Sequence, residues 1–141
     1  MSAECGVRRG IIMSEHAQNR LLLERTKAFA FRIIRLCKYI PDGRIEQMIT
    51  SQLMRCGTSV GANYRAACRA RSAAEFRAKL GIVEEEADES IYWMELIAER
   101  GTMPIERLQD LISEANEILA MVVASIRTSR ASAENSNSKG I

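Results

Sequence analysis

Four stretches of this sequence place apolar residues at alternating steps of three and four positions, and short segments containing glycine, proline or serine separate them. Such spacing gathers apolar side chains on one face of an α-helix. We therefore predict helices over about 19–40, 44–71, 72–100 and 105–128. The predicted core residues are Leu22, Phe29, Ile33, Leu36 and Ile40 in the first helix, Ile45, Ile49, Leu53, Cys56, Val60 and Ala67 in the second, Phe76, Leu80, Val83, Ala87, Ile91, Met94 and Ala98 in the third, and Leu108, Ile112, Ala115, Leu119, Val122 and Ile126 in the fourth.

The segments between these stretches carry residues that end and begin helices. PDG at 41–43 ends the first helix, because proline and glycine both disfavour its continuation. Ser72 and Glu75 form a capping-box pattern, in which a hydroxyl and a carboxylate accept hydrogen bonds from free amides at a helix start. GTMP at 101–104 supplies a glycine stop and a proline for the next first turn. Three short connections make sequential helices antiparallel, so we predict an all-α fold, an antiparallel up-down-up-down four-helix bundle.

The expected organisation is one domain over 19–128, with a flexible leader at 1–18. The last residues, SRASAENSNSKGI at 129–141, are small and polar, so a disordered polar tail is predicted there. The chain has no run of about 18 apolar residues and no apolar stretch of signal-peptide length near its start, so we expect a cytoplasmic protein without a membrane partner. Its cysteines lie at no metal-ligand spacing, and Cys37, Cys56 and Cys68 fall inside helical patterns, which favours reduced thiols.

Catalytic and metal-binding patterns are missing from the predicted bundle. Di-metal sites in four-helix bundles use Glu-x-x-His pairs, and the single histidine, His16, lies in the leader. No histidine is therefore placed to activate Ser59 or a cysteine as a nucleophile. We expect no cofactor, no metal and no enzymatic activity.

Two consecutive stretches of the chain carry opposite charge. From Arg55 to Lys79 there are six basic residues and one acid, whereas Glu84 to Glu99 holds seven acids and no base. Both stretches are predicted to be helical, so the charges lie on defined faces and create a field that a polyanion or a partner subunit would experience.

Basic side chains share the outward sides of the first two predicted helices. On the second helix, Arg55, Arg65 and Arg69 lie within about a quarter of a turn at 100° per residue, and guanidinium groups donate paired hydrogen bonds to phosphate oxygens. On the first helix, basic residues alternate with Phe31 and Tyr39, which suits phosphate contacts combined with base stacking. The predicted nucleic-acid contacts are Arg55, Arg65, Arg69, Lys27, Arg32, Arg35 and Lys38.

Two other interpretations of these residues stay open. The arginines can form an ordinary solvated face, or they can pair with the acidic helix of a neighbouring subunit. Phe31 and Tyr39 can equally be oligomer contacts with stacked arginines.

Gly57 and Gly61 stand four residues apart inside a predicted helix. Glycine there costs up to about 1 kcal/mol relative to alanine, so we expect a second helix to approach closely at this point. Ser59 and Asn63 would lie at the edge of the core, with Glu89 as a candidate hydrogen-bond partner. A phosphate-binding loop is the weaker alternative, because the segment lacks its lysine and its strand-to-helix context.

The third predicted helix carries a second apolar strip. Ile82, Trp93 and Leu96 lie away from its core stripe, with Glu89 beside them. Exposed apolar strips commonly mark association surfaces, so we predict a homo-oligomer whose interface includes Ile82, Glu89, Trp93 and Leu96.

Several segments together resemble a known family. RTKAFAFRIIRL at 25–36, RCGTSVGANYRAACRARSAAEFRAKLGIVEEEADESIYWMEL at 55–96 and the last helix resemble the bacterial four-helix-bundle proteins encoded by intervening sequences within large-subunit ribosomal RNA genes. A related branch is the accessory protein of diversity-generating retroelements. The most specific residues are Arg55, Thr58, Ser59 and Asn63, followed by Phe76, Leu80 and Glu89.

This resemblance implies a four-helix bundle assembled as a ring-shaped homopentamer, with a basic surface for structured RNA or an RNA-handling protein and without enzymatic activity. Our first hypothesis is therefore a non-enzymatic, cytoplasmic, oligomeric accessory protein that binds nucleic acid, structured RNA being favoured. The alternative is an oligomeric scaffold or protein-interaction module without a nucleic-acid ligand.

Overall fold

The computed structural model describes residues 14–140, which form four long helices and one short turn of 3-10 helix. The elements are α2 (Glu15–Lys38), α3 (Arg44–Cys68), α4 (Ala73–Glu99), η1 (Ile105–Arg107) and α5 (Gln109–Lys139). No β-strand occurs between residues 14 and 140. The predicted all-α, four-helix fold is confirmed.

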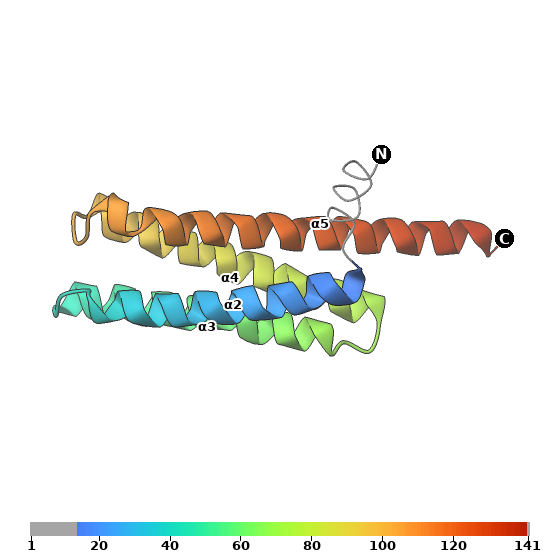
Figure 1. Ribbon diagram of the computed structural model, residues 1–141, viewed down its shortest axis with the longest axis horizontal. Helices are drawn as coiled ribbons and strands as arrows, with labels where there is room; N and C mark the ends of the chain where they lie inside the picture. The colour runs from blue at the N-terminus through green and yellow to red at the C-terminus, as the bar shows by residue number, and fades with distance from the viewer. Residues whose placement is uncertain (1–13, 141) are drawn as a thin grey trace, which may run out of the picture.

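The four helices lie lengthwise along one long axis (Figure 1). The chain reverses direction at each of the three connections, and the last part of α5 extends beyond the end of the bundle. α2 and α4 each pack against both α3 and α5. α2 and α4 therefore occupy diagonal positions, and their outer faces point away from each other.

Serine side chains cap the first turns of α2 and α4, and the sequence predicted the second of these caps. The hydroxyl of Ser14 accepts a hydrogen bond from the amide of Ala17, and α2 begins at Glu15. Ser72 accepts a hydrogen bond from the Glu75 amide at 3.0 Å. The Glu75 carboxylate reaches one residue further than in an ordinary capping box and accepts from the Arg71 amide at 3.1 Å.

α4 ends at a left-handed glycine. Gly101 has φ +78°, a conformation that residues with a Cβ rarely adopt. The Gly101 amide donates to the carbonyl of Ala98, and the Thr102 amide donates to the carbonyl of Ile97. The predicted glycine stop is confirmed.

The core follows the predicted stripes with a few shifts. Tyr64, Ile97 and Ile118 are fully buried although the stripes did not include them, while Ile45 is 45% exposed because it lies in the first turn of α3, at the end of the bundle. Partly buried residues packed against the core include Leu36, Phe76, Ala98 and Leu119. The buried hydroxyls of Thr26 and Ser90 donate to the carbonyls of Leu22 and Glu86, which satisfies them within their own helices.

The predicted close approach at Gly57 and Gly61 is confirmed. A Cβ added to Gly57 would lie 2.8 Å from Cγ1 of Ile33, and one added to Gly61 would lie 3.2 Å from the carbonyl oxygen of Thr26. Both neighbours belong to α2. Alanine at Gly57 would therefore force Ile33 to shift, and alanine at Gly61 would press on the backbone of α2, so both glycines lie where α2 approaches α3 closely.

The ends of the bundle differ from the predicted boundaries. α2 begins at Glu15, four residues before the predicted start, and the rest of the predicted leader, residues 1–13, lies outside the described residues. The structure continues α5 through the segment predicted to be a disordered tail, as far as Lys139. A helix that the bundle has already nucleated extends at little further entropic cost, and residues 130–134 contain good helix formers.

Among residues 14–140, no helix is both long and apolar enough to cross a membrane.

Candidate nucleic-acid interface

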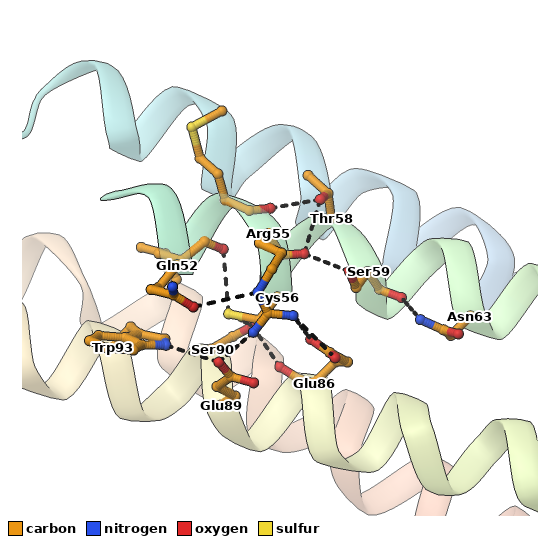
Figure 2. A network of polar contacts seen from close by, with 12 residues as sticks. Gln52, Arg55, Cys56, Thr58, Ser59, Asn63, Glu86, Glu89, Ser90 and Trp93 are labelled. Atoms are coloured by element: carbon orange, nitrogen blue, oxygen red, sulfur yellow. Dashed lines mark hydrogen bonds and ion pairs between the residues drawn. The ribbon is translucent and has the colours of Figure 1, made fainter. Parts of the chain in front are cut away.

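Arg55, a predicted phosphate contact, reaches across the bundle from α3 to α4. Its Nη2 lies 2.5 Å from Oε1 of Glu89, and its Nη1 lies 3.4 Å from Oε2 of Glu86. Figure 2 shows this guanidinium pointing at both carboxylates, with Trp93 beside Glu89. Arg55 therefore already has two acidic partners within its own chain.

Glu89 is held by donors from two residues. Burial raises the pKa of its carboxyl, but the hydrogen bond and charge of Arg55 and the hydrogen bond from Trp93 outweigh that effect, so the pKa is lowered overall. The indole nitrogen of Trp93 donates to the same oxygen as Arg55, at 3.3 Å. Glu89 is consequently ionised at neutral pH and joins α4 to α3.

The predicted contact of Glu89 with Ser59 and Asn63 is wrong. The hydroxyl of Ser59 donates to the carbonyl of Arg55 at 2.6 Å, and the amide nitrogen of Asn63 donates to the carbonyl of Ser59 at 2.9 Å. Figure 2 shows both side chains turned back onto α3. Short polar side chains satisfy themselves on their own helix in this way, which leaves Glu89 to the longer Arg55.

Arg25 forms a similar pair of ionic contacts between two other helices. Its guanidinium pairs with Glu114 and, at 2.6 Å, with Glu117, both on α5. The hydrogen bond to Glu114 is the largest effect on Arg25 and raises its pKa. Arg25 therefore joins α2 to α5.

Lys27, Arg65 and Arg69 follow one another along the junction of α2 and α3. A Cβ added to Gly61 would lie 3.5 Å from the backbone nitrogen of Lys27, and Arg65 follows Gly61 by one helical turn. Arg69 directly follows the last residue of α3 and caps it, one turn further on. All three basic side chains are exposed, and none forms an ion pair with the residues described here. We call Lys27, Arg65 and Arg69 the basic seam.

The other predicted contacts lie further along α2. Arg35 and Lys38 are exposed and Arg32 is half-buried. Phe31, one helical turn before Arg35, is 55% exposed. Tyr39 stacks with Arg107, which was not among the predicted contacts. The guanidinium carbon of Arg107 is 5.3 Å from the centre of the Tyr39 ring.

The predicted oligomer strip is only partly accessible. Ile82 is exposed, whereas Trp93 and Leu96 are half-buried and pack against the core from α4. The ring of Trp93 also meets Tyr92 edge to face, with 5.2 Å between centroids. Tyr92, at 54% exposed, lies on the outer side of α4 and was not among the predicted interface residues.

The acidic partners of Arg55 could have been found from the sequence, but those of Arg25 could not. Arg55 and residues 86–89 stand nearly equally far from the turn at about residue 71, so two antiparallel helices must bring them level. Arg25 and Glu114 belong to helices that are not consecutive, and no local pattern sets their register.

Residues 14–140 contain no group of three or more histidine, cysteine or acidic side chains that could hold a metal ion.

The model of the 23S rRNA-intervening sequence protein family matches residues 19–124. The chain belongs to this family. The match of the intervening-sequence family covers α2 from its second turn, all of α3 and α4, and the first half of α5. The second half of α5 lies outside it.

One solved structure supports the same assignment. The chain is 32% identical to a protein of unknown function from the S23 ribosomal protein family of Bacteroides thetaiotaomicron, with a TM-score of 0.73. The alignment covers 78% of this chain and 98% of that one. The comparison with curated proteins gives no match.

Proposed function

We propose that this intervening-sequence family member is a non-enzymatic, cytoplasmic, homo-oligomeric accessory protein that binds structured RNA through the basic seam. The family resemblance suggests a pentamer. The observation that carries the proposal is a division among the basic residues. Arg25, Arg55 and Arg100 have carboxylate partners in the chain, whereas Lys27, Arg65 and Arg69, like the predicted contacts further along α2, have none among residues 14–140.

Phosphate is the chemistry that suits this arrangement. Two guanidinium groups one turn apart on α3, with an ammonium group across the junction on α2, can contact successive phosphates of one strand. The guanidinium groups need not give up a carboxylate first, so binding requires no intramolecular ion pair to break. In this proposal Arg55 joins α3 to α4 through Glu86 and Glu89 and is no longer counted among the phosphate contacts.

The test measures binding of a fluorescein-labelled RNA hairpin by anisotropy, beside a DNA hairpin of the same sequence. We expect the Lys27→Gln/Arg65→Gln/Arg69→Gln variant to bind at least tenfold more weakly than the wild type. The matched control is Arg127→Gln/Arg130→Gln/Lys139→Gln, which removes the same charge from exposed positions of α5 and should bind almost normally. Equal losses in both variants would show that only net charge matters and would contradict a defined site.

The second candidate is a scaffold without a nucleic-acid ligand. It is favoured by the outer side of α4, which is acidic and would attract a basic protein surface but repel nucleic acid. Absence of binding to either hairpin at low salt would select this candidate.

A further inference from the structure

A groove opens at the end of the bundle where the chain enters α2. Its volume is about 730 Å³, within the roughly 300–1,000 Å³ of typical ligand sites in proteins. Its walls come from the first turns of α2, the end of α3, the start of α4 and the second half of α5. Figure 1 shows the start of α2 and the turn between α3 and α4 at this end, with α5 passing beyond them.

The lining of this groove is small, uncharged and partly apolar. Alanines, serines and Cys68 surround the half-buried Phe76. Glu15 is the one charged residue among those that line it, so the groove offers no cation to a phosphate or a carboxylate. The hydroxyl of Tyr64 donates to Oδ1 of Asn19 at 3.1 Å, which joins the α3 wall to the α2 wall. The groove therefore suits an apolar peptide segment better than an anionic ligand.

The chain itself supplies such a segment directly beside the groove. Residues 1–13 lie outside the described residues and precede Ser14, the cap of α2, while Glu15 already belongs to the groove wall. Residues 11–13 read IIM and are three consecutive large apolar side chains. Because the segment is joined to the wall, its effective concentration at the groove is on the order of millimolar, so burial of these side chains has little entropy of association to offset.

We propose that residues 1–13 dock into this groove of their own chain, with residues 11–13 covering Phe76 and Cys68. The docked segment joins the start of the chain to the second half of α5. The contact involves neither the basic seam nor the outer faces of α2 and α4. Its test is therefore independent of RNA binding and of the oligomer.

Alkylation of Cys68 tests the contact from the side of the groove. The folded full-length chain is treated with iodoacetamide at pH 8, and the rate at each cysteine is followed by mass spectrometry of its peptides. We expect Ile11→Ser/Ile12→Ser to raise the rate at Cys68 about fivefold or more, because the segment no longer covers this thiol. Cys37, near the opposite end of α2, is the internal control and should keep its rate. An unchanged rate at Cys68, or an equal rise at Cys37, would overturn a contact confined to the groove.

Trypsin cleavage tests the contact from the side of the segment. Arg8 and Arg9 are cleavage sites that docking should protect. Ala133 lines the groove, whereas Ala131 on the same helix is exposed and does not. We expect Ala133→Gln to accelerate cleavage at these arginines about fivefold or more, and the matched control Ala131→Gln to keep the wild-type rate. Equal rates in the wild type and both variants would overturn the proposal.

Dilution distinguishes docking within one chain from docking on a second copy. Protection of Arg8 and Arg9 should stay constant when the protein is diluted at a fixed trypsin concentration, because a tethered segment keeps its effective concentration. Protection that is lost on dilution would show that the segment occupies the groove of another copy and would contradict the proposal.

Discussion

Arg55 and Glu89 face each other across α3 and α4, with 2.5 Å between Nη2 and Oε1. The same oxygen also accepts a hydrogen bond from Trp93. This contact links the basic and the acidic stretch of the sequence inside a single chain. Part of the charge segregation therefore supports the fold, and only the remaining basic residues are available to a ligand.

Arg55→Gln should remove a component of stability that depends on pH. The pKa of Glu89 is lowered from its ordinary value of 4.5, so its ionised form is favoured in the folded state. A depressed carboxyl pKa contributes stability above the unfolded value and loses it as pH falls through the folded value. Urea unfolding should therefore show a wild-type advantage that is constant above about pH 5 and shrinks as the pH falls below the ordinary glutamate pKa of 4.5. An advantage that does not change with pH would contradict the ion pair.

Alanine at Gly57 and at Gly81 should have opposite effects on stability. A Cβ at Gly57 would meet two carbons of the fully buried Ile33 within 3.0 Å, and overpacking of this kind costs about 1–3 kcal/mol. A Cβ at Gly81 would meet nothing within 4 Å, so Gly81→Ala should stabilise α4 by up to about 1 kcal/mol. Chemical denaturation measures both. Equal effects would show that α2 does not approach α3 at Gly57.

The close helix contact at Gly57 and much of the fold were predictable from the sequence. The spacing of Gly57 and Gly61 predicted a close helix contact, and the apolar repeats predicted four helices and most of the core. Ile45 was misassigned because a repeat does not say where a helix leaves the bundle. The tail beyond Ser129 was misassigned because its composition opposes packing but does not prevent continuation of a helix that has already formed.

The candidate site was less predictable than the fold. Helical projection placed Arg55, Arg65 and Arg69 on one side of α3 but gave no information on which of them has a partner. That distinction depends on the register between α3 and α4. The contact of Arg25 with Glu114 and Glu117 depends on the packing of α2 against α5, which no local pattern records.

The cysteine thiols should be slow to react in the folded protein. Burial raises the pKa of Cys37 to about 11, with a smaller contribution from Cys56, so only about a thousandth of Cys37 is thiolate at pH 8. Burial also raises the pKa values of Cys56 and Cys68. In a Cys5→Ser background, Ellman's reagent at pH 8 should react slowly with native protein and rapidly after denaturation. A thiol that reacts rapidly in the native protein would contradict this packing.

Truncation after Arg130 should leave the bundle intact. It keeps Ser129, whose hydroxyl accepts a hydrogen bond from Arg77 at 3.0 Å. It removes Ser132, Ala133 and Ser136, which line an open groove of about 730 Å³ together with residues of α2, α3 and α4. Circular dichroism should show a smaller helix signal with a melting temperature within a few degrees of the full chain. As a control, truncation after Ser125 also removes the buried Ile126 and should lower the melting temperature clearly. Similar melting temperatures for both truncations would contradict the packing of α5.

The most direct measurement of the central claim is the salt dependence of RNA-hairpin binding. Each phosphate contact contributes about 0.7–0.9 to the slope of log K against log salt concentration. The Lys27→Gln/Arg65→Gln/Arg69→Gln variant should therefore show a slope about 2 units shallower than the wild type, while the α5 control variant should keep the wild-type slope. Identical slopes for all three proteins would contradict RNA binding at the basic seam.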